Sequence, residues 1–374
     1  MDWLDANYVR NLVETTKFSL NELSSHLRTV YPEETGLSEC NLSRFCKKHS
    51  IQCQRYSDTL TDEQLDTEVA TSVMERVHPV NHQNRQAGTE KSLNPTPCYA
   101  PHFGYNLHMD QNEKLVDFGI VFVMAIDGCS AYITAASAMP RKNNLLIYEN
   151  VFRVTVENFG LWESLIVDHG KEFHLTLFIQ HFLRQNSSSQ RPPYRQVPST
   201  VNNRIERLWV EVNQRVGFPI KACLIDLEQQ ELITRNNQVH LHAMSQVGIK
   251  VAAHGLNTMV QSWNGHNIQG KGRPLEYLPT SQTMPISDLP SPEYAKQLYE
   301  DSDGRSLTED YTVGSDPLSG DPQRQISRDA KFDSDLKNQI GDISMIFGAT
   351  VNHNFKPFQD SVKLYLAVTE EFWQ

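Results

Sequence analysis

Long apolar runs and a disulfide framework are both missing from this chain of 374 residues. No window approaches the roughly 20 consecutive apolar residues that a membrane helix needs, so we expect no membrane span. The start of the chain has neither the basic stretch nor the apolar stretch of a secretory signal. The six cysteines are scattered without a recurrent spacing, which is typical of a reducing compartment. We therefore expect a nuclear or cytoplasmic protein.

Positive charge is also scarce. The formal net charge is −11 at pH 7, which argues at first against a nucleic-acid partner. The acidity is uneven, however, because residues 281–374 carry 8 Lys and Arg against 16 Asp and Glu, whereas residues 100–280 carry 16 against 15. Acidic residues that bind a metal are neutralised when the metal is bound. The net charge therefore neither excludes nor predicts a nucleic-acid partner.

The first 57 residues have the pattern of short helices. Ser19–Glu22 has the Ser-x-x-Glu form of a capping box, which predicts the start of a helix. After a turn at residues 31–36, a second helix is expected over Ser38–His49. Two short helices across such a turn suit a helix-turn-helix.

The second of these helices carries Arg44, Lys47 and Lys48. A cluster of basic residues on such a helix is typical of phosphate contacts with DNA. The solvated face of another small helical domain would show the same residues, so both interpretations stay open. The cysteine and histidine spacing nearby matches no familiar zinc site.

Residues 58–100 are predicted to be a helix followed by a linker. Leucine and valine recur every four residues over Thr61–Val77, which is the period of one helix face. His78–Pro101 is polar and is broken by glycine and proline, as linkers are.

Strand patterns alternate with helix patterns from about residue 103 to about residue 216. The expected strands are 105–110, 118–126, 131–139 and 165–167, and the expected helices are 144–159, 171–184 and 201–216. The second and third strands join at Asp127–Gly128, a dipeptide that favours hairpin turns. A polar loop is expected over Asn186–Pro198. This order predicts a mixed α/β sheet with an antiparallel opening and a parallel addition.

The last part of the chain consists of two segments that differ in sequence pattern and composition. Residues 219–279 keep a helical pattern, and we expect a helical extension there. Residues 280–374 begin with a stretch rich in Ser, Pro, Asp and Gly, which predicts an acidic and largely disordered tail.

Three acidic residues stand at informative places in this pattern. Asp110 is expected to close the first strand, Asp168 to close the fourth, and Glu206 to lie in the helix after the polar loop. Carboxylates at the carboxyl ends of adjacent strands face one crevice, and hard oxygen ligands suit Mg²⁺ or Mn²⁺. Two such ions can clamp the attacking and leaving oxygens of a phosphodiester. Taken alone, acids at strand ends and on helices are more often turn or surface residues.

Four blocks of sequence add a resemblance to a known family. They are His108–Leu115, Ala125–Ser130, Val167–Phe173 and Pro198–Trp209. Together they resemble the integrase core of retroviruses, retrotransposons and transposon-derived animal proteins. The resemblance implies a ribonuclease-H-like fold, a mixed five-stranded sheet with helices on both faces.

The resemblance also implies a site. The family's three catalytic, metal-binding acids fall on Asp110, Asp168 and Glu206, which are separated by 58 and 38 positions. His169 and Lys171 flank the second acid, Arg204 and Arg207 flank the third, and all four are expected to contact DNA. The retroviral amino-terminal zinc module and the basic carboxy-terminal barrel have no counterpart in this sequence.

Neighbouring residues are given structural roles. Asp127 is expected to shape its hairpin turn, and Glu172 to cap a helix, although it could also replace a metal ligand. Trp209 is expected in the core, with the option of wedging under the helix of Glu206. His240 and His242 lie on opposite sides of a helix and make a poor metal pair.

The predicted organisation has five parts: a helix-turn-helix-like module (1–57), a helix and linker (58–100), an integrase catalytic core (101–218), a helical extension (219–279) and an acidic tail (280–374). The implied function is Mg²⁺- or Mn²⁺-dependent cutting and joining of DNA, as in transposition or integration. Two alternatives stay open: a host-adopted DNA-binding or scaffold protein without turnover, and a ribonuclease acting on RNA–DNA hybrids. A homo-oligomer is compatible with the sequence, which leaves the oligomeric state open.

Overall fold

The computed structural model describes residues 3–51 and 99–373, apart from short gaps at 16–17, 19, 186, 188, 199–201, 232, 269–270 and 304. The chain divides into two compact units, residues 1–94 and residues 95–374. The helix predicted over Thr61–Val77, the capping residue Ser19 and most of the predicted linker lie outside the described residues. Within the ranges that the structure describes, no helix is both long enough and apolar enough to span a membrane.

The amino-terminal unit is helical, as predicted. Helix α1 (Ala6–Arg10) continues into a π-helical turn, and α2 (Leu20–Val30) and α3 (Glu39–Lys48) follow. The Ser38 side chain accepts a hydrogen bond from the backbone N–H of Asn41, which satisfies one free donor at the start of α3. The helices bury an apolar core made of Val9, Val13, Leu23, Leu27, Leu42 and Phe45.

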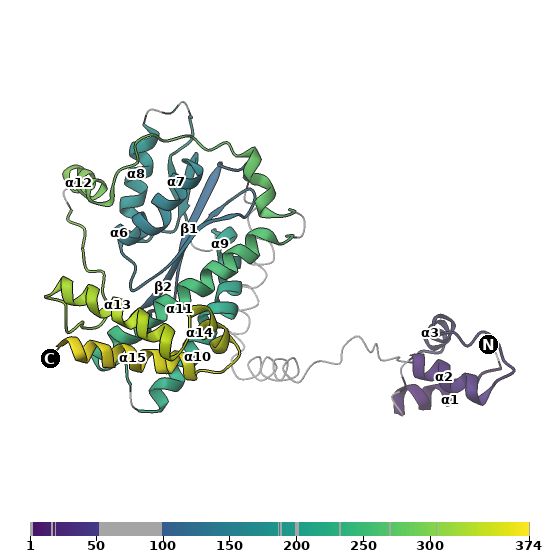
Figure 1. Cartoon of the computed structure of the whole chain (residues 1–374). Coiled ribbons are helices and arrows are strands. Elements are labelled where there is room, and N and C mark those ends of the chain that lie inside the picture. Colours follow the sequence, from purple (N-terminus) through teal and green to yellow (C-terminus); the bar gives the residue numbers. More distant parts are fainter. Residues whose placement is uncertain are drawn as a thin grey trace, which may run out of the picture. The chain divides into compact units, whose positions relative to one another are not determined.

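The larger unit is built on a five-stranded sheet (Figure 1). Its strands are β1 (Asn106–Leu115), β2 (Ile120–Asp127), β3 (Ile133–Met139), β4 (Ser164–Val167) and β5 (Tyr194–Gln196). The order is β3-β2-β1-β4-β5, with antiparallel pairs among the first three strands and parallel pairs of β1 with β4 and of β4 with β5. This is the mixed, ribonuclease-H-like arrangement that the sequence predicted.

Strand β2 is buried along its whole length, because helices cover both faces of the sheet. Side chains alternate between the two faces of a strand. Val121, Val123 and Ala125 accordingly join one apolar cluster, whereas Phe122 and Met124 join another.

The first face is covered by helices that follow β3 and β4. They are α6 (Asn144–Ile147), a π-helical segment (Tyr148–Arg153), α7 (Val154–Phe159) and α8 (His174–Arg184). Asn143 starts the first of them by accepting hydrogen bonds from the backbone N–H groups of Leu145 and Leu146.

The second face is covered by helices that follow β5. They are α9 (Asn203–Val212), a π-helical segment (Asn213–Gly217), α10 (Phe218–Gln229) and α11 (Gln238–Gly265). Helix α11 packs directly on β3, and near its end the Asn264 amide bonds both the N–H and the C=O of Ile133. The segment expected as a helical extension therefore forms part of the layer on the sheet.

The prediction of a disordered tail is wrong. The segment folds into α12 (Pro292–Asp303), α13 (Pro322–Gln339), α14 (Ile343–Val351) and α15 (Lys356–Trp373). Helix α12 packs on α8, whereas α14 and α15 pack on α10 and α11, as Figure 1 shows. Apolar residues spaced along these helices are fully or nearly buried: Phe332, Leu336, Ile346, Phe358, Val362 and Tyr365. Their burial offsets the polar composition that suggested disorder.

Candidate active site

Asp110 lies in the middle of β1, and the expectation that it closes the strand is wrong. The strand continues to Leu115, because His108, Asp110 and Asn112 alternate with the apolar Leu107 and Met109. Such alternation is a strand pattern, with the polar residues on the side of α9.

Asp168 comes directly after β4, as predicted. His108 pairs with Ile166 across the parallel strands, and Asp110 and Asp168 stand two positions further along. Side chains two positions apart share a face, so both aspartates belong to the face covered by α9. The Asp168 carboxylate accepts a hydrogen bond of 2.9 Å from the backbone N–H of Gly170, which holds the turn after the strand.

Glu206 lies in the first turn of α9 and is half-buried. It falls four residues after Asn202, three before Trp209 and seven before Asn213. Residues at these spacings share one helix face, and α9 contacts β1. The third acid is therefore on the side of the helix that meets the strand of Asp110.

The three carboxylates interact electrostatically. Burial is the main cause that raises the pKa of Asp110 to about 7, and the negative charges of Glu206 and Asp168 raise it further against a hydrogen bond from Trp209. Burial also raises the pKa of Glu206, and Asp168 adds to that effect. The register of β1 with β4 and the contact of α9 with β1 bring the three predicted acids to one side of the sheet.

The residues suit a hard divalent cation by their chemistry. Carboxylate oxygens are the ligands that Mg²⁺ and Mn²⁺ prefer, and the crowding of negative charge on Asp110 is what a cation would neutralise. Within the part of the chain that the structure describes, however, no group of three or more His, Cys, Asp or Glu residues is arranged to hold a metal ion. The acids share one electrostatic site without forming a closed cage.

Trp209 has a role that the sequence did not reveal. Its indole Nε1 donates to Asp110 Oδ2 at 2.9 Å, while the ring is buried in the core under α9. The bond orients the carboxylate and favours its charged form. The available signal was the spacing, because Trp209 follows Glu206 by one helical turn.

The predicted DNA-binding residues of the core lie around the acids to different extents. His169 and Lys171 are exposed next to Asp168, Arg207 is exposed on α9, and Arg204 is half-buried. Among the described residues, Arg204 Nε is buried without a hydrogen-bond partner.

Two further cations, Arg195 and Lys271, belong to this surrounding and were not predicted from the sequence. Burial lowers the pKa of His108 to about 4, and the positive charges of Arg204, Arg195 and Lys271 contribute to the lowering against the hydrogen bond that its Nδ1 donates to Asn202 Oδ1. Arg195 pairs in register with Ile166, which places it on the face of His108. The cations therefore gather on the side of the sheet that carries the acids.

Asp127 is structural, as predicted. The buried carboxylate accepts five hydrogen bonds: from the N–H groups of Gly104, Cys129 and Ser130, from the Ser130 hydroxyl and from Trp162 Nε1. Glu172 does not cap its helix. Its carboxylate instead accepts a hydrogen bond from Gln111 and lies 3.7 Å from Lys142 Nζ.

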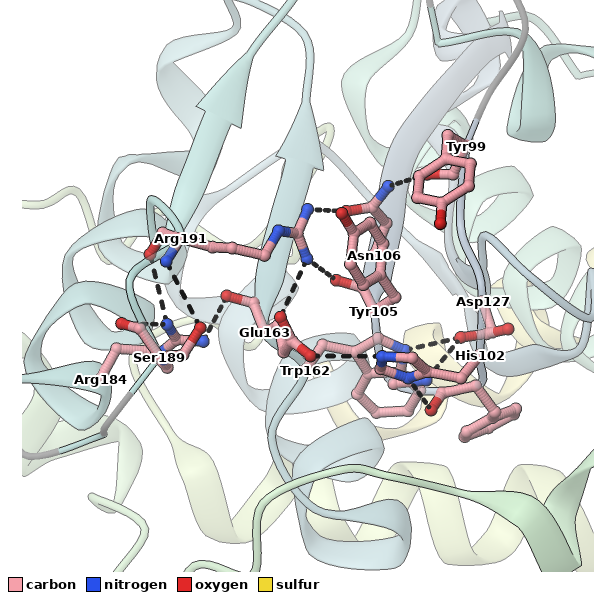
Figure 2. A network of polar contacts seen from close by, with 12 residues as sticks. Tyr99, His102, Tyr105, Asn106, Asp127, Trp162, Glu163, Arg184, Ser189 and Arg191 are labelled. Carbon is pink, nitrogen blue, oxygen red and sulfur yellow. Dashed lines mark hydrogen bonds and ion pairs between the residues drawn. The ribbon is translucent and has the colours of Figure 1, made fainter.

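A separate polar network holds the chain that leads into β5 (Figure 2). The Arg191 guanidinium stacks on the Tyr105 ring at 3.4 Å from its centroid, donates to the Tyr105 carbonyl and to Asn106 Oδ1, and pairs with Glu163. Arg184 also donates to the carbonyl of Glu163. The expected polar loop is thus tied to β1 and β4 before its last residues form the fifth strand.

In the amino-terminal unit, Arg44, Lys47 and Lys48 are all exposed on α3. The helix presents its basic side chains to solvent, while Leu42, Phe45 and Cys46 turn inward. Within the described residues of this unit, the helices suit the predicted helix-turn-helix, and its binding to DNA stays a prediction.

Comparison with known families agrees with the fold. The family model described as "Integrase core domain" matches residues 102–276. These residues are an integrase core domain. The matched range includes Asp110, Asp168 and Glu206, and it ends at residue 276, after α11. No protein with a curated description matches the chain in sequence.

Viral integrases are among the solved structures that match the chain. One is the HTLV-2 integrase catalytic core domain in complex with magnesium, at 12% identity and a TM-score of 0.31, covering 48% of this chain and 99% of that one. Another is the simian T-cell lymphotropic virus intasome in complex with the PP2A regulatory subunit B56 gamma, at 13% identity and a TM-score of 0.30, covering 59% and 78%. Because both TM-scores are low, the assignment rests on the family match and on the sheet topology.

Proposed function

We propose that the integrase core domain binds Mg²⁺ or Mn²⁺ through Asp110, Asp168 and Glu206, and that it cuts and joins DNA. The observation that carries the proposal is the convergence of three carboxylates, on β1, directly after β4 and on α9, on one face, where burial and then the neighbouring charges raise the pKa values of Asp110 and Glu206. Such crowding destabilises the free protein, and it is useful where a cation is bound.

The residues have distinct tasks in this proposal. Asp110 and Asp168 are held on the sheet, with one Asp110 oxygen fixed by Trp209, whereas Glu206 approaches from a helix. Divalent cations held by such acids supply electrostatic stabilisation of the attacking and leaving oxygens of a phosphodiester.

Positive side chains around the acids would hold the DNA backbone. Arg204, Arg195 and Lys271 all act on His108, and guanidinium and ammonium groups bind phosphate oxygens. His169, Lys171 and Arg207 extend this positive surface on the exposed side. Action on chromosomal DNA would place the protein in the nucleus.

Nicking and joining of labelled DNA duplexes tests the proposal. The wild-type chain should act only with Mg²⁺ or Mn²⁺, and Asp110→Asn, Asp168→Asn or Glu206→Gln should each lower the rate by at least about 100-fold. Glu211→Gln is the matched control, because Glu211 lies on the same helix and pairs at the surface with Arg215. DNA binding that is equal with and without Mg²⁺, with no products from a folded wild-type chain, would favour a scaffold protein instead.

A further inference from the structure

Three polar pairs join β1 to the helix that carries Glu206. We call them the β1–α9 pairs. They are His108 Nδ1 with Asn202 Oδ1 at 2.7 Å, Trp209 Nε1 with Asp110 Oδ2 at 2.9 Å, and Asn112 Nδ2 with Asn213 Oδ1 at 3.1 Å. Every one of the six side chains is at most 8% exposed. Hydrogen bonds so well removed from water are stronger than surface ones, and they are costly to leave unmade.

The spacing of the pairs fits both elements. Positions 108, 110 and 112 share one face of a strand and span about 13 Å at the rise of a β-strand. Positions 202, 209 and 213 share one face of a helix and span about 16 Å at the rise of an α-helix. The helix therefore runs along the strand in the same direction. Glu206 falls between the first pair and the second.

Asn202 shows that the first pair serves more than helix stability. Asparagine is favoured at the residue before a helix because its side chain accepts a bond from a first-turn N–H. Asn202 occupies that place, yet within the described part of the chain its side chain makes no capping bond. Its Oδ1 meets His108 and its Nδ2 donates to the Met109 carbonyl at 3.3 Å. The amide joins the start of α9 to β1.

Apolar packing alone would fix this helix less well. Ile205, Leu208 and Val212 are fully buried beside the pairs, and contacts between apolar side chains tolerate small shifts better than hydrogen bonds do. A shift of α9 by one turn would leave all three pairs unsatisfied, at about 1–3 kcal/mol for each buried group. The pairs thus select one register of helix against strand.

We propose that the β1–α9 pairs fix Glu206 opposite Asp110, and that Asn202, Trp209 and Asn213 are positioning residues for the three-acid site. This inference rests on the proposed function, since it gives the register a purpose in metal binding. The register itself can be measured without metal.

Two measurements on the full chain test the inference. Hydrogen exchange without metal reports how firmly residues 203–216 are held, and the electron paramagnetic resonance of free Mn²⁺ reports affinity for the cation. Asn202→Ala and Trp209→Phe should speed exchange within 203–216 and weaken Mn²⁺ binding by about 10–100-fold, as loss of an orienting partner does. Gln214→Ala is the matched control, because Gln214 is exposed on the π-helical segment that continues α9.

Substitution of His108 supplies a rescue test. Asn places an amide nitrogen where the imidazole has Nδ1, so His108→Asn should keep near-wild-type exchange and affinity. His108→Leu lacks the donor and should behave like Asn202→Ala.

The possible failures differ from one another. The inference would be overturned if Asn202→Ala and Trp209→Phe had the same hydrogen exchange and the same Mn²⁺ affinity as Gln214→Ala. Exchange that quickens equally in β2 and α11 would also overturn it, because the pairs would then serve general stability. A wild-type chain that binds no Mn²⁺ would remove the proposed metal site and the purpose given to the pairs, while local loosening of 203–216 would still establish that they hold the register.

Discussion

Asp110 is the residue at which stability and the proposed function oppose each other. It is buried on β1, faces two other carboxylates and accepts a hydrogen bond from Trp209. The hydrogen bond favours the charged form, but burial and the two neighbours prevail and raise the pKa to about 7. Sites that need clustered charge commonly cost stability in this way.

The raised pKa of Asp110 predicts that the stability of the metal-free protein depends on pH. Because the pKa of Asp110 is raised on folding, the folded chain binds more protons than the unfolded chain between the ordinary carboxyl pKa and about 7. The contribution of Asp110 to the free energy of unfolding is therefore greatest at acidic pH, and it is lost as the pH rises through about 7. The pKa of Glu206 is also raised, so this group too lowers the stability as the pH rises.

Asp110→Asn should remove most of the dependence. The amide oxygen that the substitution introduces would still accept from Trp209, so the free energy of unfolding at about pH 8 should rise by on the order of 2 kcal/mol over that of the wild type. Urea unfolding with a chelator, at about pH 5 and about pH 8, measures the difference. A variant that is less stable than the wild type at the higher pH would contradict the account of this residue.

At the scale of the element, α3 is the helix expected to contact DNA. Replacing Arg44, Lys47 and Lys48 together by Ala should weaken DNA binding and flatten its dependence on salt, by about 0.9 in log–log slope for each lost phosphate contact. Arg28→Ala is the control, since Arg28 is exposed on α2. Fluorescence anisotropy over a series of salt concentrations gives both quantities. An unchanged slope would reassign α3 to protein contacts or packing.

The elements also show what the sequence could reveal about the fold. The long apolar run of β2 and the hairpin to β3 were predictable because both faces of the sheet are covered. Strand β1 was predicted too short, because residues 111–114 are polar on both faces of the strand. Strand β5 has only three residues, all of them exposed, so it carries no apolar period. In the C-terminal helices, solvent-facing charged residues outnumber buried residues such as Phe332. The polar composition therefore suggested disorder.

The residues of the site were likewise predictable only in part. Asp110, Asp168 and Glu206 could be named because they stand in recognisable blocks. The partners that orient them could not, because each depends on the register between elements far apart in the chain: His108 and Asn202 are 94 positions apart. No local pattern encodes such a pairing.

At the scale of the molecule, the C-terminal helices are part of the larger unit. Arg328 of α13 is buried, lies 2.7 Å from Asp316 and stacks on the Tyr365 ring of α15 at 5.0 Å. Asp316 also lies 3.6 Å from His242 of α11. One buried ion pair thus joins α13 and α15 to a helix that packs on the sheet.

Arg328→Ala should therefore destabilise the whole unit. Removal of one partner leaves Asp316 buried without its main counter-charge, at a cost of about 3–5 kcal/mol. Lys331→Ala, on the same helix, removes only surface pairs with Asp335 and Glu371, and should change the stability far less. Urea unfolding followed by fluorescence compares the two variants. Equal effects would show that the C-terminal helices add little to the stability of the core.

The most direct test of the account is anomalous diffraction from crystals of the full chain grown with Mn²⁺. We expect an anomalous peak at about 2.0–2.3 Å from carboxylate oxygens of Asp110 and Asp168, as hard-cation ligands require, with Glu206 turned toward it. Crystals of Asp110→Asn grown in the same way should lack the peak. A wild-type crystal with Mn²⁺ bound elsewhere, or with these three acids bare while the protein cuts DNA, would contradict the assignment of the site.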